Sequence, residues 1–192
     1  MRAHDLGETQ RLRLFRHEEN SLECAYVRTP GLWGVIGVLA VLGHAIYSLT
    51  PFALELGSRS LDVVEIVALV GWVAFNGYSE GYRAFHRQFS PRVVARARAL
   101  DAAPRPLFVA LAPLYVMGLV HATRRRLIVS WSIVVGIVGI VVVVRMLEQP
   151  WRGIIDAGVV VGLAWGVLSI VYYTARAFAG RTIPVAPDLP PQ

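Results

Sequence analysis

The stretch Gly118–Trp131, GLVHATRRRLIVSW, places three consecutive arginines between two apolar runs. Because hydrocarbon excludes charged side chains, such a triplet indicates the end of a membrane-spanning segment. The following run, residues 127–147, is long enough to span a bilayer. The preceding run, residues 106–121, would make a helix of roughly 24 Å against roughly 30 Å of hydrocarbon, and Pro113 lies near its centre. Its length alone therefore does not decide whether it crosses.

The composition of the whole chain is typical of a membrane protein. Of its 192 residues, 55% are hydrophobic and only 17% are charged, and the mean hydropathy is +0.52. Besides residues 127–147, apolar runs at about 31–56, 61–86 and 153–178 reach the length of a span. We expect an all-α fold, a polytopic transmembrane helical bundle of four spans in which short links make antiparallel hairpins of the first pair and the last pair.

The distribution of charge favours four spans over five. All 19 basic residues are arginine. With a cytoplasmic N-terminus, 16 arginines lie inside and 3 outside if residues 106–121 do not cross; the split is 13 and 6 if they do. Short loops follow the positive-inside rule, so we predict that both termini are cytoplasmic and that residues 106–121 form a re-entrant or interfacial segment. Five spans remain the alternative, and the net charge of +6 suits a prokaryotic inner (plasma) membrane.

Three segments outside the spans have distinct compositions. Residues 1–30 contain no short apolar core with a cleavage site, so we expect a cytoplasmic segment followed by a span that directs its own insertion. The proline-rich tail, residues 182–192, is predicted to be disordered or extended.

The cytoplasmic connection, residues 87–126, contains a helix-start signature at Ser90 and Pro91. We interpret the segment that begins there as a short basic amphipathic helix lying on the inner leaflet. The equally weighted alternative is a charged loop needed only for orientation. The arginines expected to contact lipid headgroups are Arg92, Arg96, Arg98, Arg124, Arg125 and Arg126.

Ionisable and polar residues within the spans are the candidate functional site. At 100° per residue, the second span carries a polar stripe on which Glu80 and Arg83 can pair. The stripe is either structural, which we favour, or a proton or ion path with Glu80 as the titrating group. His44 is expected to form a hydrogen bond within the bundle, near the depth of Trp72. The candidate intramembrane site is His44, Glu65, Asn76, Glu80, Arg83 and Asp156.

Small residues indicate where helices approach closely. The last span carries Gly158, Gly162 and Gly166 at steps of four, which line one face of a helix. Glycines also recur in the first and third spans. We expect these small-residue faces to pack against each other in one compact bundle, with homodimerisation through the last span as the competing possibility.

Enzymatic signatures are missing from the sequence. It contains no nucleophile–base motif, phosphate loop or cofactor fingerprint, its one cysteine is Cys24, and no second histidine lies at the depth of His44 to hold a haem. We predict no cofactor, no metal and no nucleic-acid partner. The predicted function is a non-enzymatic structural or accessory membrane bundle, whose partners are anionic lipid and a second copy or another membrane protein. A small transporter or ion conductor is the alternative, and an enzyme acting on lipid headgroups is weaker still.

Overall fold

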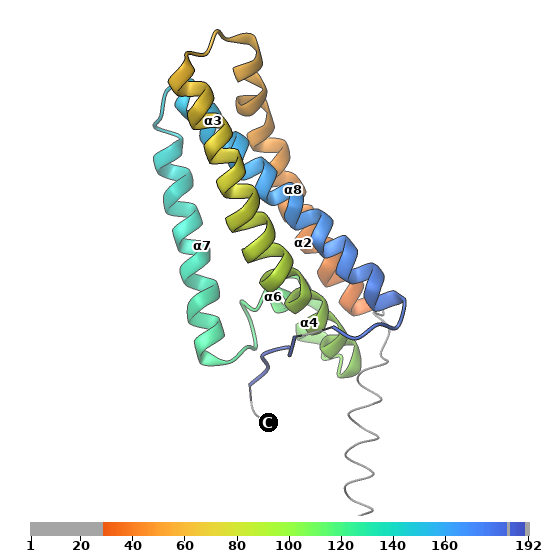
Figure 1. Cartoon of the computed structure of the whole chain (residues 1–192). Helices are drawn as coiled ribbons and strands as arrows, with labels where there is room; N and C mark the ends of the chain where they lie inside the picture. Colours follow the sequence, from red (N-terminus) through yellow and green to blue (C-terminus); the bar gives the residue numbers. More distant parts are fainter. Residues whose placement is uncertain (1–28, 184, 191–192) are drawn as a thin grey trace, which may run out of the picture.

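The computed structural model describes residues 29–183 and 185–190 (Figure 1). The predicted cytoplasmic segment therefore lies outside the described residues, except for its last two positions, which begin the first helix. The described residues form helices and irregular segments without a strand. Long helices run between two ends of the molecule (Figure 1). We call the lower end in that view the arginine-rich end and the upper one, which holds the links 56–62 and 145–150, the hairpin end.

The first half of the described chain runs up and back between these ends. Helix α2, Thr29–Glu55, leads to the hairpin end, where the 3₁₀-helix η1, Leu56–Ser58, closes the turn. Helix α3, Val63–Asn76, returns and continues without a break into the π-helix η2, Gly77–Phe89, and then α4, Ser90–Ala102. A reciprocal pair of hydrogen bonds starts α3, because Asp62 accepts from the Glu65 amide and Glu65 accepts from the Asp62 amide.

Residues 106–121 do not form a continuous helix. They contain α5, Pro106–Ala110, and α6, Ala112–Val116, each of five residues. Pro113 has no amide hydrogen to donate to the preceding turn, which favours a break at this point. Two such short helices cannot cross a bilayer, and the chain enters and leaves them at the arginine-rich end (Figure 1). Neither short helix is among the helical segments long and apolar enough to cross a membrane.

The second half of the chain also runs up and back, through α7, Arg124–Val144, and α8, Trp151–Phe178. Three described helical segments are long and apolar enough to cross a membrane, namely Thr29–Ser58, Arg124–Val144 and Trp151–Phe178. The predicted second span, residues 61–86, is not among them. Its first half is the 14-residue α3, and its second half is the more polar η2. The structure is thus that of an all-helical, membrane-compatible protein with three candidate spans.

Helix α8 is the centre of the bundle. It packs against α2, α3, η2 and α4, whereas α2 and α3 lie on different sides of it. In contrast, α7 is joined at its two ends and packs along no other described helix (Figure 1). The two antiparallel hairpins are present, but the expectation that they form one compact bundle is wrong, because α8 lies between α2 and α3 and because α7 stands apart from α8.

Helix α4 is buried rather than spread on a surface. It lies among α2, α6, α8 and η2, and its residues Val93, Val94, Ala97 and Leu100 belong to the hydrophobic core together with residues of α2, α6 and α8. The predicted helix is present, which excludes the alternative of a charged loop, but its predicted place on the inner leaflet is wrong. The apolar face of α4 is covered by protein, and two of its arginines are also buried.

Arg96 is 1% exposed and is surrounded by backbone carbonyl groups. Its guanidinium lies 4.5 Å from the centre of the Tyr115 ring. Each of its three nitrogens donates to the backbone, and no carboxylate of the described residues forms an ion pair with it. The prediction that Arg96 contacts lipid headgroups is wrong, because its donors are already used. The acceptors are the carbonyls of Tyr115 (2.6 Å), Pro187 (2.9 Å), Val120 (2.9 Å) and His121 (3.0 Å).

Arg98 and Asp101 join α4 to the ends of the two longest helices. Arg98 is 8% exposed and donates to the carbonyls of Ala177 and Arg181, each at 3.0 Å, at the end of α8. Asp101 accepts a 2.7 Å hydrogen bond from the Gly31 amide in the first turn of α2. Arg98 is therefore also no headgroup ligand, and the prediction for it is wrong.

The tail is held against the arginine-rich end. Ile183 and Leu189 pack against the core, and the Thr123 amide donates to the Asp188 carbonyl (3.2 Å). The Asp188 carboxylate forms a 3.4 Å ion pair with Arg92. Residues 185–190 have no regular secondary structure, which is compatible with the extended alternative of the prediction, whereas these contacts argue against the disordered one. Arg96 contributes to the docking of the tail because it donates a hydrogen bond to the Pro187 carbonyl.

Replacing Arg96 by lysine should destabilise the protein although the charge is kept. An ammonium group cannot reach four carbonyls in a planar fan, so buried carbonyls lose their donors, at a cost of about 2–3 kcal/mol. Reversible unfolding of purified protein in mixed micelles would measure this change. The matched control is Arg124→Lys, at an exposed position, and equal stability of the two variants would contradict the role given to Arg96.

Candidate functional site

The contact between α8 and the α3–η2 helix brings the glycine stripe against the polar stripe. A Cβ placed on Gly158 would lie 2.6 Å from the Trp72 Nε1 atom and 2.9 Å from the Asn76 Nδ2 atom. A Cβ placed on Gly162 would lie 3.0 Å from a Glu80 carboxylate oxygen. The two helices can approach this closely only because the positions on α8 are glycines.

The glycines therefore serve packing within one chain. Gly166 meets the ring of Phe85 in the same way. The glycines of α2 face α4 and α6 instead, since Gly31 meets Ala97 and Gly34 meets Ala112 and Val116. The expectation that the small-residue faces of the three spans pack against one another is wrong. The α8 stripe receives larger side chains, the first α2 glycines meet α4 and α6, and nothing lies within 4 Å of a Cβ added to the α7 glycines. Homodimerisation through the α8 stripe conflicts with the same contacts, since α3–η2 occupies that face.

Polar groups at this contact differ in how they are satisfied. Trp72 Nε1 donates to the Ile155 carbonyl of α8 (3.2 Å). Asn76 is 1% exposed and donates to the Trp72 carbonyl of its own helix (2.9 Å). Glu80 is half-buried, and its carboxyl group has neither a hydrogen bond nor an ion pair with any described residue. Among Trp72, Asn76 and Glu80, it is the one whose polar side-chain group bonds to no described residue.

The predicted pair between Glu80 and Arg83 is absent from residues 29–183, and Arg83 is exposed. The physical reason is the π-helix. Its i→i+5 hydrogen bonds increase the number of residues per turn, so positions calculated at 100° per residue drift off the face that meets α8. Gly81 and Phe85 take that face, where Gly81 meets Trp165 and Phe85 meets Gly166.

His86 and Ser169 extend the contact towards the arginine-rich end. The His86 Nδ1 atom lies 3.2 Å from the Ser169 hydroxyl, and the His86 ring lies 5.4–5.9 Å from the ring centres of Tyr82, Tyr172 and Tyr173. Neither His86 nor Ser169 was among the residues predicted from sequence. The sequence signal for this contact is that Ser169 lies one turn beyond Gly166 on α8, at the same depth as His86 on η2.

The remaining predicted site residues lie apart. His44 is exposed and makes no hydrogen bond within the described residues, so its predicted bond near Trp72 is wrong. Glu65 completes the start of α3. Asp156 is 3% exposed, and its carboxylate lies 3.8 Å from the Arg152 Nε atom on the same helix. Of the six candidates, only Asn76 and Glu80 share one contact surface.

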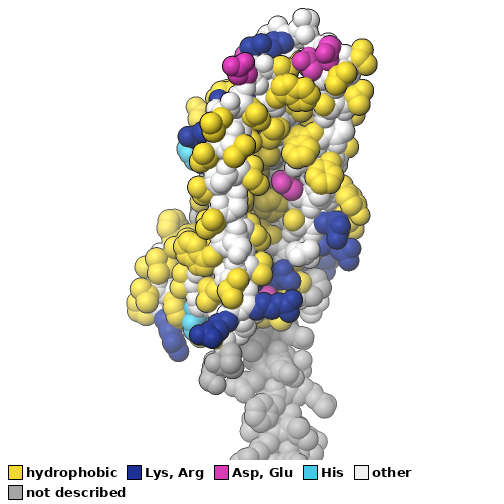
Figure 2. Space-filling model, turned by 90° about the vertical axis from the view of Figure 1, so that its left-hand side faces the viewer, with side chains coloured by type: hydrophobic (Ala, Val, Ile, Leu, Met, Phe, Trp, Pro, Cys, Tyr) yellow, Lys and Arg dark blue, Asp and Glu magenta, His cyan; other side chains and the backbone are white. Residues whose placement is uncertain are grey.

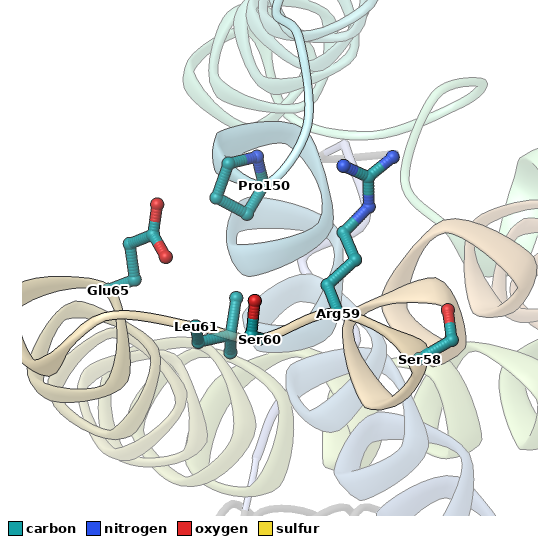
Figure 3. Close-up of a pocket in the computed structure, with 6 residues that line it drawn as sticks. All are labelled: Ser58, Arg59, Ser60, Leu61, Glu65 and Pro150. Carbon is teal, nitrogen blue, oxygen red and sulfur yellow. The ribbon is translucent and has the colours of Figure 1, made fainter.

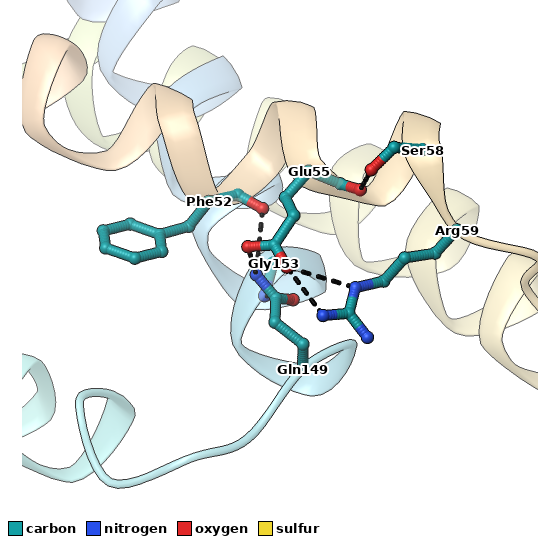
Figure 4. Close-up of polar contacts among 6 residues, drawn as sticks. All are labelled: Phe52, Glu55, Ser58, Arg59, Gln149 and Gly153. Atoms are coloured by element: carbon teal, nitrogen blue, oxygen red, sulfur yellow. Dashed lines mark hydrogen bonds and ion pairs between the residues drawn. The ribbon is translucent and has the colours of Figure 1, made fainter.

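The hairpin end is closed by polar contacts of Gln149 (Figure 4). Its amide nitrogen donates to the Phe52 carbonyl (3.3 Å) and to the Glu55 carboxylate (3.0 Å), and its oxygen accepts from the Gly153 amide (3.1 Å). Glu55 also forms a 2.6 Å ion pair with Arg59. These bonds join the end of α2 to the start of α8, a structural role that the sequence did not predict for Gln149.

A shallow, open pocket lies beside this end (Figure 3). Its lining residues are Ser58, Arg59, Ser60, Leu61, Glu65 and Pro150. Arg59 is engaged by Glu55, and Glu65 is engaged by the Asp62 amide. Within the described ranges no group of three or more His, Cys, Asp or Glu residues is placed to hold a metal ion. The polar groups of this pocket therefore serve the turn itself.

Gly158→Val should destabilise the bundle because the added side chain would enter the volume of Trp72 and Asn76. Overpacking of this kind costs about 1–3 kcal/mol. The matched control is Gly139→Val on α7, where nothing lies within 4 Å of the added Cβ. Unfolding of the purified chain in mixed micelles would compare them, and a Gly158 variant as stable as the Gly139 variant would contradict the close approach.

Comparison with known proteins reveals no relative of this chain. No protein-family model matches the chain, and neither a curated protein nor a solved structure matches it. Its function is therefore inferred from its own residues.

Proposed function

We propose that the chain is a small multi-pass protein of a prokaryotic inner membrane with four spans, acting as a non-enzymatic accessory bundle. Three helices have the length and apolarity of spans. The continuous helix α3–η2 is proposed as the fourth span because it runs alongside α8 between the two ends of the molecule (Figure 1). It also exposes large apolar side chains, among them Val63, Val67, Val70 and Phe75.

The charge distribution supports an orientation with both termini in the cytoplasm. Of the 14 arginines in the described ranges, three lie at the hairpin end, namely Arg59, Arg145 and Arg152. The other eleven lie in the half towards the opposite end. Figure 2 shows a mainly apolar surface between charged groups that gather towards the two ends, with an acidic side chain within it. The positive-inside rule places the arginine-rich end in the cytoplasm, and α5 and α6 then form an interfacial or re-entrant segment.

The observation that carries the accessory role is the isolation of α7. In its most apolar window only 6% of residues are buried, against 39% for α8. Its glycines, Gly136 and Gly139, have no neighbour within 4 Å. A single apolar helix is stable in lipid, yet this one is tied into the chain at both ends while adding nothing to the bundle core. Such a helix suits lateral contact with another membrane protein.

Photocrosslinking amino acids placed singly along α7 would test this role. In native membranes we expect protein adducts at positions three or four apart, such as Val135, Val138 and Val142, because a packed helix presents one face. The same scan on the purified chain in liposomes separates a second copy from a different partner. Protein adducts at none of the positions, in both preparations, would mean that α7 contacts only lipid. Adducts at every position would mean that no single face of α7 is packed, and either result would contradict the accessory role.

Ion or proton conduction is the second candidate, and the unpartnered carboxyl group of Glu80 favours it. Flux through liposomes containing wild type, Glu80→Gln or the control Glu148→Gln distinguishes the two functions. Glu148 is exposed at the hairpin end. An accessory bundle should conduct with none of the three. Flux in wild type and in the Glu148 variant that disappears with Glu80→Gln would replace the accessory role by conduction.

A further inference from the structure

Four segments meet at the start of α7. They are α4, the link 117–123, the first turn of α7 and the tail segment 185–190. Asp188 joins two of them, since its carbonyl accepts from the Thr123 amide (3.2 Å) and its carboxylate lies 3.4 Å from the Arg92 Nε atom. Arg126 lies over Gly118, where an added Cβ would come within 3.2 Å of the Arg126 Nε atom.

Positive charge exceeds negative charge at this junction. Burial lowers the pKa of Arg96, the nearby charge of Arg126 lowers it further, and Asp188 opposes both effects. Arg126 lies in the first turn of α7, which begins directly after Thr123, and the Thr123 amide donates to the Asp188 carbonyl. Three guanidinium groups therefore share one carboxylate. The positive end of the α7 dipole adds to the imbalance, since the first turn contains no acidic residue.

Two of these guanidinium groups have hydrogen-bond donors to spare. The donors of Arg96 are taken by carbonyls. The Arg92 Nε atom is buried without a hydrogen bond although its side chain remains 29% exposed. Arg126 is half-buried and makes no hydrogen bond or ion pair within the described residues. A ligand that brings acceptor oxygens and negative charge would satisfy both side chains.

We propose that Arg92 and Arg126 form a binding site for a phosphate group at the arginine-rich end. A guanidinium group can donate two parallel hydrogen bonds to the oxygens of one phosphate. Two guanidinium groups from different helices can therefore hold a phosphate between them. Asp188 occupies part of this site and competes with the ligand. The phosphate is that of an anionic lipid headgroup or of a soluble phosphate compound. The lipid source rests on the proposed membrane placement, whereas the phosphate chemistry does not.

Native mass spectrometry of the detergent-solubilised protein tests the site. Phosphatidylglycerol, phosphatidylcholine and inorganic phosphate are titrated separately. Arg126→Gln or Arg92→Gln should weaken binding of phosphatidylglycerol by about tenfold, the loss of one charge-assisted contact. The control Arg124→Gln, at an exposed position two residues away, should change it less than about twofold. Asp188→Asn should tighten binding, an effect that misfolding cannot produce.

The outcomes separate the sources and the alternatives. Binding of phosphatidylglycerol with no response to inorganic phosphate identifies a lipid headgroup, and binding of both identifies the phosphate group itself. Equal losses in the Arg124 and Arg126 variants would show diffuse surface charge and overturn the site, as would weaker binding after Asp188→Asn. These results do not depend on whether α7 has a partner or whether liposomes conduct.

Discussion

The positive charge of arginine must be kept out of hydrocarbon or be surrounded by oxygen atoms, and this constraint organises the molecule. Eleven of the fourteen arginines in the described ranges lie towards one end. Arg96 is the extreme case, since its guanidinium is buried and satisfied by four carbonyls. Those carbonyls belong to α6, the link after it and the tail. One side chain therefore joins segments that are 19 to 91 positions away from it in the sequence.

A second constraint, the close approach of helices, sets the arrangement of the spans. In lipid, helices gain little from burying apolar surface against each other, so contact area and backbone proximity matter more. The α8 glycines let Trp72, Asn76 and Glu80 lie directly on its backbone. At the hairpin end, Gln149 joins α2 to α8. Helix α8 is central because it supplies a glycine or a backbone carbonyl to each neighbour: Gly153 to α2, the stripe glycines to α3 and η2, and the Ala177 carbonyl to α4.

Much of the helical pattern could be predicted from the sequence. The apolar runs 31–56, 127–147 and 153–178 agree closely with α2, α7 and α8, because an apolar run of that length has few alternatives to a helix. Length and Pro113 also indicate that residues 106–121 form no long helix, and they form the two short helices α5 and α6. Which helices pack together could not be predicted, because an apolar run does not say whether it faces lipid or protein.

The errors have specific physical causes. Arg96 and Arg98 were assigned to lipid because an arginine on a short helix ordinarily faces polar surroundings, and no local pattern reveals distant carbonyls. α-Helical winding would bring Arg83 beside Glu80, but the segment that contains them is π-helical. The tail segment 185–190 contains no periodic apolar pattern, and its docking depends on contacts with Arg92 and Arg96 made through folding. Only Asn76 and Glu80 of the predicted polar site came together as expected from spacing.

The side of the membrane on which the arginine triplet lies is the most direct test of the threading that the charge constraint implies. In a Cys24→Ser background, single cysteines replace Arg125 and Ser60, two exposed positions at opposite ends. A membrane-impermeant maleimide should label position 60 in intact spheroplasts and position 125 only in inside-out vesicles. Labelling of position 125 from the periplasmic side, or of both positions from one side, would contradict the four-span threading.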